Sequence, residues 1–95
     1  MIPPDECLSP HLGVAQRDHV RLVWWRFYQT FERVRVMEWT CACRSTVYEL
    51  CEGGGRAFIR RIVQLENDHQ VHETHRWSIA EARANWTNLL SGKAR

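Results

Sequence analysis

The pattern of hydrophobic and polar residues changes period near residue 34. From there to residue 77, apolar and polar positions alternate in four runs that short polar or glycine-rich segments separate. Such alternation is typical of half-buried β-strands, and connections this short join only antiparallel neighbours. The pattern therefore predicts a four-stranded antiparallel meander, with strands over residues 34–43, 46–52, 56–64 and 70–77.

The loops fix a predicted register for this sheet. If the three glycines at 53–55 form a three-residue loop, Leu50 lies opposite Phe58, and a two-residue turn at 44–45 places Trp39 opposite Leu50. One face is then largely apolar and carries Met37, Trp39, Cys41, Cys43, Tyr48, Leu50, Phe58 and Ile62. The other face is mixed and carries Glu38, Thr40, Ala42, Val47, Glu49, Cys51, Ala57, Ile59 and Arg61.

A helix is predicted over residues 78–91. Ser78 and Glu81 match the S-x-x-E capping box, and Gly92 stands where a helix C-cap is expected. The residues between them form an apolar stripe of Ile79, Ala82, Trp86, Leu89 and Leu90. We expect this helix to pack on the aromatic face of the sheet.

Residues 18–33 allow two interpretations. Apolar residues from Val20 to Phe31 recur at helical spacing behind Asp18, which predicts an N-terminal helix. The same stretch is rich in β-branched and aromatic residues, which favour a strand. Trp25 and Tyr28 fall off the main apolar face, so the segment contacts either its own N-terminal arm or a partner on a second side.

The chain has the size and composition of one small domain. Its 95 residues are 44% apolar, which leaves core for a single unit of the α+β class over residues 18–95. Residues 1–17 contain all three prolines and little periodicity, and they predict an irregular or disordered lead-in. A formal charge of +2 without clustered basic residues makes nucleic-acid binding an unfavoured expectation.

Membrane and export signals are not expected either. Arg21 and Arg26 interrupt the most apolar stretch, which is shorter than the about 20 residues of a membrane helix. The first residues match no secretory signal, so we expect a cytoplasmic protein whose cysteines are reduced.

The cysteines raise the question of a metal. Cys41, Cys43 and Cys51, with the histidines at 69, 72 and 75, have the ligand types of a zinc site. In the predicted register Cys41 and Cys43 lie on one face and Cys51 on the other, so they do not converge. The expectation is no metal and no cofactor, with the cysteines packed as small apolar residues.

Catalysis is not expected. The glycines at 53–55 precede a strand, which favours a hairpin turn over a phosphate-binding loop. No segment places a nucleophile beside a base, and Glu49 and Glu52 have arginines nearby that make ion pairs the simpler explanation. The sequence therefore predicts a protein that is not an enzyme.

Three stretches carry a resemblance: WTCACRSTVYELCEGGGRAFIRR at 39–61, HETHR at 72–76 and AEARANWTNLLSGKAR at 80–95. Over residues 37–95 the chain resembles small actinobacterial proteins of the Streptomyces type, a group that is similar to the developmental regulator BldB. The resemblance implies a cytoplasmic, non-enzymatic regulator that acts through protein contacts, as a dimer or with another protein. It implies no catalytic residues.

These observations lead to one expected function and one alternative. We expect an interaction module that regulates transcription or development through a protein partner or self-association as a homodimer. The candidate contact surface is Val20, Trp25, Tyr28, Val47, Ile59 and Arg61. The alternative is a small zinc-stabilised nucleic-acid-binding protein that uses Cys41, Cys43 and the arginines of the third predicted strand.

Overall fold

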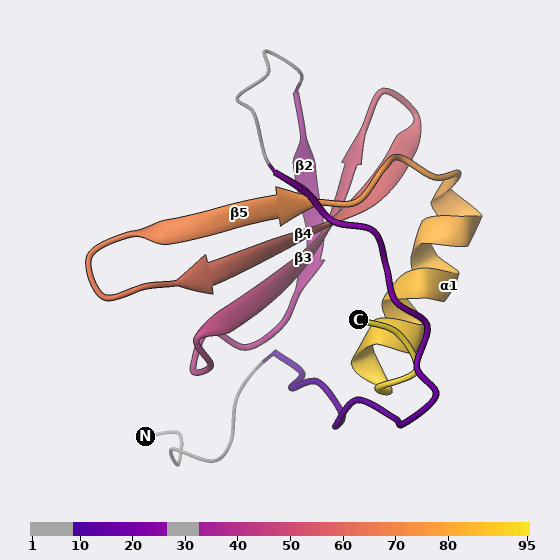
Figure 1. Cartoon of the computed structure of the whole chain (residues 1–95). Coiled ribbons are helices and arrows are strands. Elements are labelled where there is room, and N and C mark those ends of the chain that lie inside the picture. Colours follow the sequence, from indigo (N-terminus) through magenta and orange to yellow (C-terminus); the bar gives the residue numbers. More distant parts are fainter. Residues whose placement is uncertain (1–8, 27–32) are drawn as a thin grey trace.

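The computed structural model describes residues 9–26 and 33–95. It is an α+β fold with one sheet and one helix on one of its faces (Figure 1). The strands are β1 (Trp25–Arg26), β2 (Arg35–Trp39), β3 (Thr46–Gly53), β4 (Arg56–Gln64) and β5 (His69–Glu73), and the helix is α1 (Ile79–Leu90). Within the described residues, no helix is long and apolar enough to cross a membrane.

The five strands lie in the order β1-β5-β4-β3-β2, and all neighbours are antiparallel. The predicted meander is confirmed as β2 to β5, although β2 ends at Trp39 and β5 at Glu73, earlier than expected. The predicted N-terminal helix is wrong over residues 18–26, which contain no helix. Trp25 and Arg26 pair with β5 instead, so backbone pairing at a free sheet edge outweighs the helical spacing. The rest of that predicted helix, 27–32, lies outside the described residues.

The β3–β4 hairpin differs from the predicted register by one residue. Leu50 pairs with Ile59, and Cys51 pairs with Phe58. The reason is the turn, because Gly54 and Gly55 have φ of 61° and 77°, as a two-residue type I′ hairpin requires. A shift of one residue moves every β4 side chain to the other face, so Phe58 lies opposite to the face that carries Leu50.

The β2–β3 pairing is also shifted by one residue. Trp39 pairs with Glu49 and Glu38 with Leu50, after an irregularity between Val36 and Glu38 that the sequence did not predict. Beyond β2, the Thr40 N–H donates to the Tyr48 carbonyl at 2.9 Å, and the Thr40 hydroxyl accepts from the Tyr48 N–H at 2.9 Å. This double contact fixes the chain where it enters the connection to β3.

The predicted C-terminal helix is confirmed. The Ser78 hydroxyl accepts from the Glu81 N–H at 3.2 Å, and Gly92 has a φ of 85° just after the last turn. Ala82, Trp86 and Leu89 are buried against the sheet. The helix covers the face of Tyr48, Leu50, Ala57 and Ile59, so the expectation that Phe58, Ile62 and Trp39 lie beneath it is wrong.

An arm of residues 9–24 runs beside the C-terminal end of α1 before it reaches β1 (Figure 1). Its backbone pairs with the end of the chain: the Gly13 N–H donates to Leu90, the Gln16 N–H to Gly92 and the Val20 N–H to Lys93, each at 2.7 Å. The Trp24 indole donates to the Arg95 carbonyl at 3.2 Å. The arm therefore closes one end of the core and buries Ala94.

Candidate interaction face

The sheet face opposite α1 is the open face. Among the described residues, no helix covers it. Cross-strand pairing places five side chains in one row across all five strands: Trp39, Glu49, Arg60, Glu73 and Trp25, from β2 to β1. Directly paired residues point to the same side of a sheet, so this row belongs to a single surface.

The centre of the row is an ion network. The Arg60 guanidinium lies 3.0 Å from a Glu73 carboxylate oxygen and 3.4 Å from a Glu49 carboxylate oxygen. All three side chains are mostly buried, with exposed fractions between 13% and 21%. Burial lowers the pKa of Arg60, but Cys51, Glu73 and Glu49 outweigh burial and raise it, so Arg60 keeps its charge.

The two ends of the row are exposed tryptophans. Trp25 is 61% exposed and Trp39 is 53% exposed, at opposite edges of the sheet. Beside the row, Val47, Ile62 and Val71 form a second, apolar row whose members are half-buried. The open face thus combines large apolar side chains with a central ion network in which Arg60 pairs with Glu49 and Glu73.

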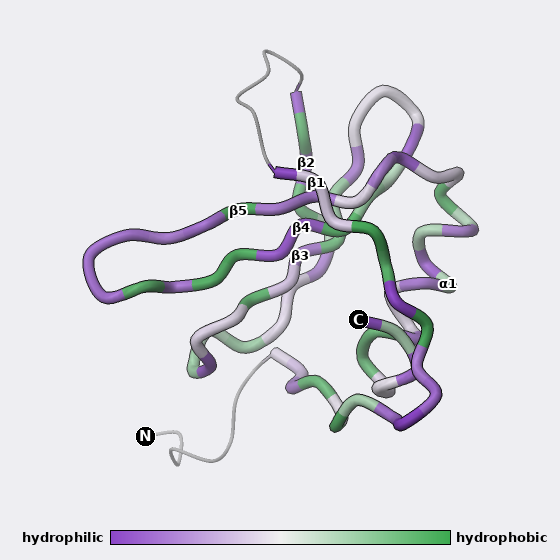
Figure 2. The backbone as a smooth tube through the Cα atoms, viewed as in Figure 1, coloured by the Kyte–Doolittle hydropathy of each residue, from purple (hydrophilic) through white to green (hydrophobic). Residues whose placement is uncertain are grey.

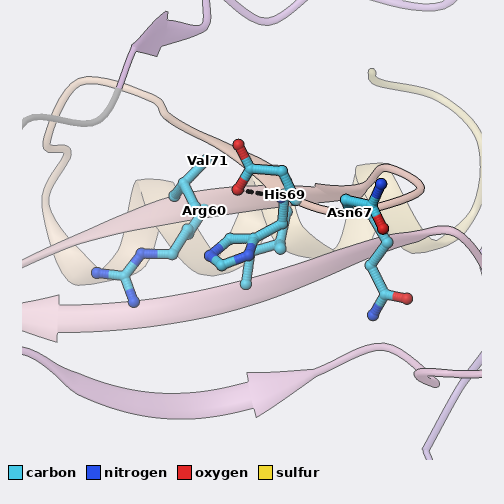
Figure 3. Close-up of a pocket in the computed structure, with 7 residues that line it drawn as sticks. Arg60, Asn67, His69 and Val71 are labelled. Atoms are coloured by element: carbon cyan, nitrogen blue, oxygen red, sulfur yellow. Dashed lines mark hydrogen bonds between the residues drawn. The ribbon is translucent and has the colours of Figure 1, made fainter.

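A shallow hollow of about 580 Å³ lies on this face, toward the tip of the β4–β5 hairpin. Arg60, Val71 and His69 line it from the side of the strands turned away from α1 (Figure 3). The hairpin tip is hydrophilic (Figure 2), and the Asp68 carboxylate there accepts from the His69 N–H at 2.8 Å. The hollow has no enclosed, apolar shape that would bury a small molecule.

Two side chains of the open face are fully buried. Phe58 lies beneath the guanidinium groups of Arg76 and Arg60, at 4.5 and 5.8 Å from its ring centre. Cys51, its cross-strand partner, is also buried, and burial raises the pKa of its thiol to about 12 although Arg60 opposes this. A thiol with that pKa is protonated at neutral pH, so Cys51 is not a nucleophile.

The predicted contact surface is only partly brought together. Trp25 and Val47 do lie on the open face, whereas Val20 is 62% exposed in the arm and Tyr28 lies outside the described residues. Arg61 lies on the covered face with its guanidinium 4.5 Å from the Trp24 ring centre.

The predicted position of Ile59 is wrong. The predicted register places it on the mixed face beside Val47, but it is fully buried beneath α1. Ile62 and Trp39 belong to the open face and were assigned to the core. Both errors come from the one-residue shifts. Three consecutive glycines at 53–55 allow either a three-residue loop or a two-residue type I′ turn, and the positive φ values of Gly54 and Gly55 identify the second.

The cysteines also lie elsewhere than expected. Cys41 and Cys43 were assigned to the apolar sheet face, but they lie in the β2–β3 connection, next to His11 of the arm. Cys51 lies on β3, and Cys7 lies outside the described residues.

No protein-family model matches this chain, and searches of curated proteins and of solved structures found no match. The resemblance to actinobacterial developmental regulators gains no support from these comparisons.

Proposed function

We propose that this protein is a non-enzymatic interaction module that self-associates through its open face. The observation that carries the proposal is the row Trp39-Glu49-Arg60-Glu73-Trp25, with exposed tryptophans at its ends and the apolar row beside it. Tryptophan and arginine are the side chains most enriched among residues that dominate binding energy at protein interfaces.

The charges of the face favour a protein partner over a nucleic acid. Arg60 lies between two carboxylates, so its positive charge is already compensated by Glu49 and Glu73. A phosphate approaching the centre of the row would meet two acidic groups, Glu49 and Glu73, together with Arg60 and with Arg76 over the neighbouring Phe58. Binding of a nucleic-acid strand relies on uncompensated positive charge beside the stacking aromatics, which this arrangement does not supply.

The same balance favours a second copy as the partner. A two-fold axis between β4 and β5 would bring Arg60 of one copy against Glu73 of the other, and Ile62 against Val71. Opposite charges then face each other across the interface, and apolar side chains contact apolar side chains, without any rearrangement of the sheet. A surface of mixed sign with a compensated net charge can pack on itself, whereas a single-sign surface cannot.

The test is the oligomeric state of the full chain, measured by native mass spectrometry and sedimentation velocity over a range of concentrations. We expect a dimer, and we expect Val71→Lys to be monomeric with an unchanged far-UV circular dichroism spectrum, because the lysine charge would be buried in the interface. Val14→Lys is the matched control, since Val14 is 91% exposed in the arm and should leave the dimer intact.

Tryptophan truncation gives a second measurement. Trp25→Ala should weaken the dimer by about 10- to 100-fold, because the same axis places Trp25 of β1 against β3 of the second copy, where it becomes a buried aromatic anchor. A wild-type chain that is monomeric at every concentration contradicts the proposal, as does a Val71→Lys variant that dimerises normally. Salt-dependent binding of single-stranded DNA that Trp39→Ala removes would instead support the nucleic-acid alternative.

A further inference from the structure

Three side chains with metal-binding atoms converge at a place that the proposed self-association does not use. His11 of the arm and Cys41 and Cys43 of the β2–β3 connection have their ligand atoms within 4.8 Å of one another. The His11 Nε2 atom lies 3.1 Å from the Cys43 Sγ atom. These residues are 32 positions apart in the sequence, so only the fold brings them together.

Backbone contacts hold both segments in this arrangement. The Cys41 N–H donates to the Pro10 carbonyl at 3.0 Å, directly before His11. Two residues after His11, the Gly13 N–H donates to Leu90 at 2.7 Å. On the other side, Thr40 is fixed by its two hydrogen bonds to Tyr48. The ligand set is therefore positioned by protein contacts alone, which lowers the entropic cost of binding an ion.

We propose that His11 Nε2, Cys41 Sγ and Cys43 Sγ bind one zinc ion. Zn–S bonds of about 2.3 Å and Zn–N bonds of about 2.0 Å at tetrahedral angles separate ligand atoms by about 3.5–3.8 Å. The three atoms are near that spacing, and shifts of less than about 1 Å would complete the geometry. With three protein ligands, a water molecule or another donor would complete the tetrahedral coordination.

The chemistry of the cluster favours zinc over harder divalent cations. Two thiolates and an imidazole are the soft and borderline ligands that zinc prefers, whereas magnesium and calcium require oxygen. The Cys43 N–H lies 3.4 Å from the Cys41 Sγ atom and donates to it, which stabilises the thiolate form that zinc binds. His11 and Cys43 are exposed and Cys41 is half-buried, so an ion can reach the site from solvent.

The expectation of a metal-free protein rested on a different position for the cysteines. It placed Cys41 and Cys43 on the sheet and combined them with Cys51, which lies on β3. In the structure the two cysteines lie beyond the end of β2, and the histidine beside them is His11 rather than His69, His72 or His75. A bound ion would cross-link the arm to the β2–β3 connection.

The test begins with the full chain purified without chelator. Elemental analysis is expected to give about one zinc per chain, and replacement by cobalt should produce thiolate-to-cobalt charge-transfer absorption. Cys43→Ser and His11→Asn should each weaken zinc binding at least tenfold in competition with a chromophoric chelator.

Two matched variants control for the residue type. Cys51→Ala removes a thiol outside the cluster, and His19→Asn removes a histidine of the same arm whose Nδ1 contacts the Gln16 carbonyl. Both should keep wild-type zinc affinity, and circular dichroism establishes that all four variants are folded. Wild-type protein that binds neither zinc nor cobalt overturns the proposal, and so does a Cys43→Ser variant with unchanged affinity.

Discussion

Cys51 illustrates how strongly the sheet changes the chemistry of a single side chain. Its side chain is fully buried on β3 opposite Phe58 of β4, and the charges of Arg60, Glu49 and Glu73 act on it. Burial raises the pKa of its thiol from 9.0 to about 12, against the opposing effect of Arg60. The thiol is therefore protonated in the folded chain at every pH where the protein is normally handled.

This pKa predicts a stability change at alkaline pH. Below pH 9 the thiol is protonated in both states, and its contribution to the free energy of unfolding is fully present. Between pH 9 and 12 the unfolded thiol loses its proton while the folded one keeps it, so stability falls by up to about 1.4 kcal/mol per pH unit. Urea unfolding of wild type and Cys51→Ala across pH 8–10.5 measures this, and the variant should show the shallower decline. Equal slopes in the two proteins would show that Cys51 does not ionise on unfolding as described.

At the scale of elements, the arm and the end of the chain form one unit with the C-terminus of α1. Arg95 donates to the Leu89 carbonyl at 2.6 Å and also to the Gly13 carbonyl. Gly92 lies against the arm, and a Cβ placed there would overlap the Val14 carbonyl group. The arm can therefore pack here only because residue 92 has no side chain, and its hydrogen bonds to the end of the chain then hold it in place.

Gly92→Ala should therefore detach the arm. The substitution combines a positive φ of 85° with the clash against Val14, and we expect a loss of about 2–4 kcal/mol in unfolding free energy. Gly55→Ala is the matched control, since it has a similar φ of 77° but nothing within 4 Å of the new atom, and it should cost only about 1 kcal/mol. Faster tryptic cleavage after Arg17 in Gly92→Ala alone would report the released arm. Equal losses of unfolding free energy in the two variants would show that the positive φ, and not the clash with Val14, causes the destabilisation.

At the scale of the whole molecule, one helix and one sheet face supply most of the core. Trp86 is 3% exposed and packs in the cluster that includes Leu50, Ile59 and Leu89. The open face adds few buried groups, mainly Cys51 and Phe58. A domain of this size has a small free energy of unfolding, so the cost of one large cavity in the core is a large fraction of it.

Tryptophans from the two faces should consequently behave differently. Trp86→Ala is expected to cost about 3–5 kcal/mol, because it removes buried apolar area and leaves a cavity. Trp39→Ala should change the stability of the monomer by less than about 0.5 kcal/mol, because that side chain is 53% exposed. Trp86→Phe should be milder than Trp86→Ala, since the buried indole N–H has no hydrogen-bond partner among the described residues. Chemical denaturation of the three variants, at protein concentrations low enough to keep the chain monomeric, tests this order. A stability loss in Trp39→Ala as large as in Trp86→Ala would contradict it.

Local signals in the sequence determined the elements that depend on neighbouring residues. The cap at Ser78, the apolar stripe and Gly92 lie within one short segment, and they fixed α1 at residues 79–90. The alternation of β3 and β4 did the same for those strands and for the antiparallel meander. These elements were predictable because the interactions that decide them are close in sequence.

Only the tertiary structure decided which residues share a surface. The faces of β4 followed from a turn conformation at Gly54 and Gly55, and one residue of register exchanged Ile59 with Ile62 between core and open face. The arm, β1 and the His11 cluster depend on partners far along the chain, such as Arg95 and Cys43. No local pattern encodes such a partner, because its position is set by how the whole chain packs.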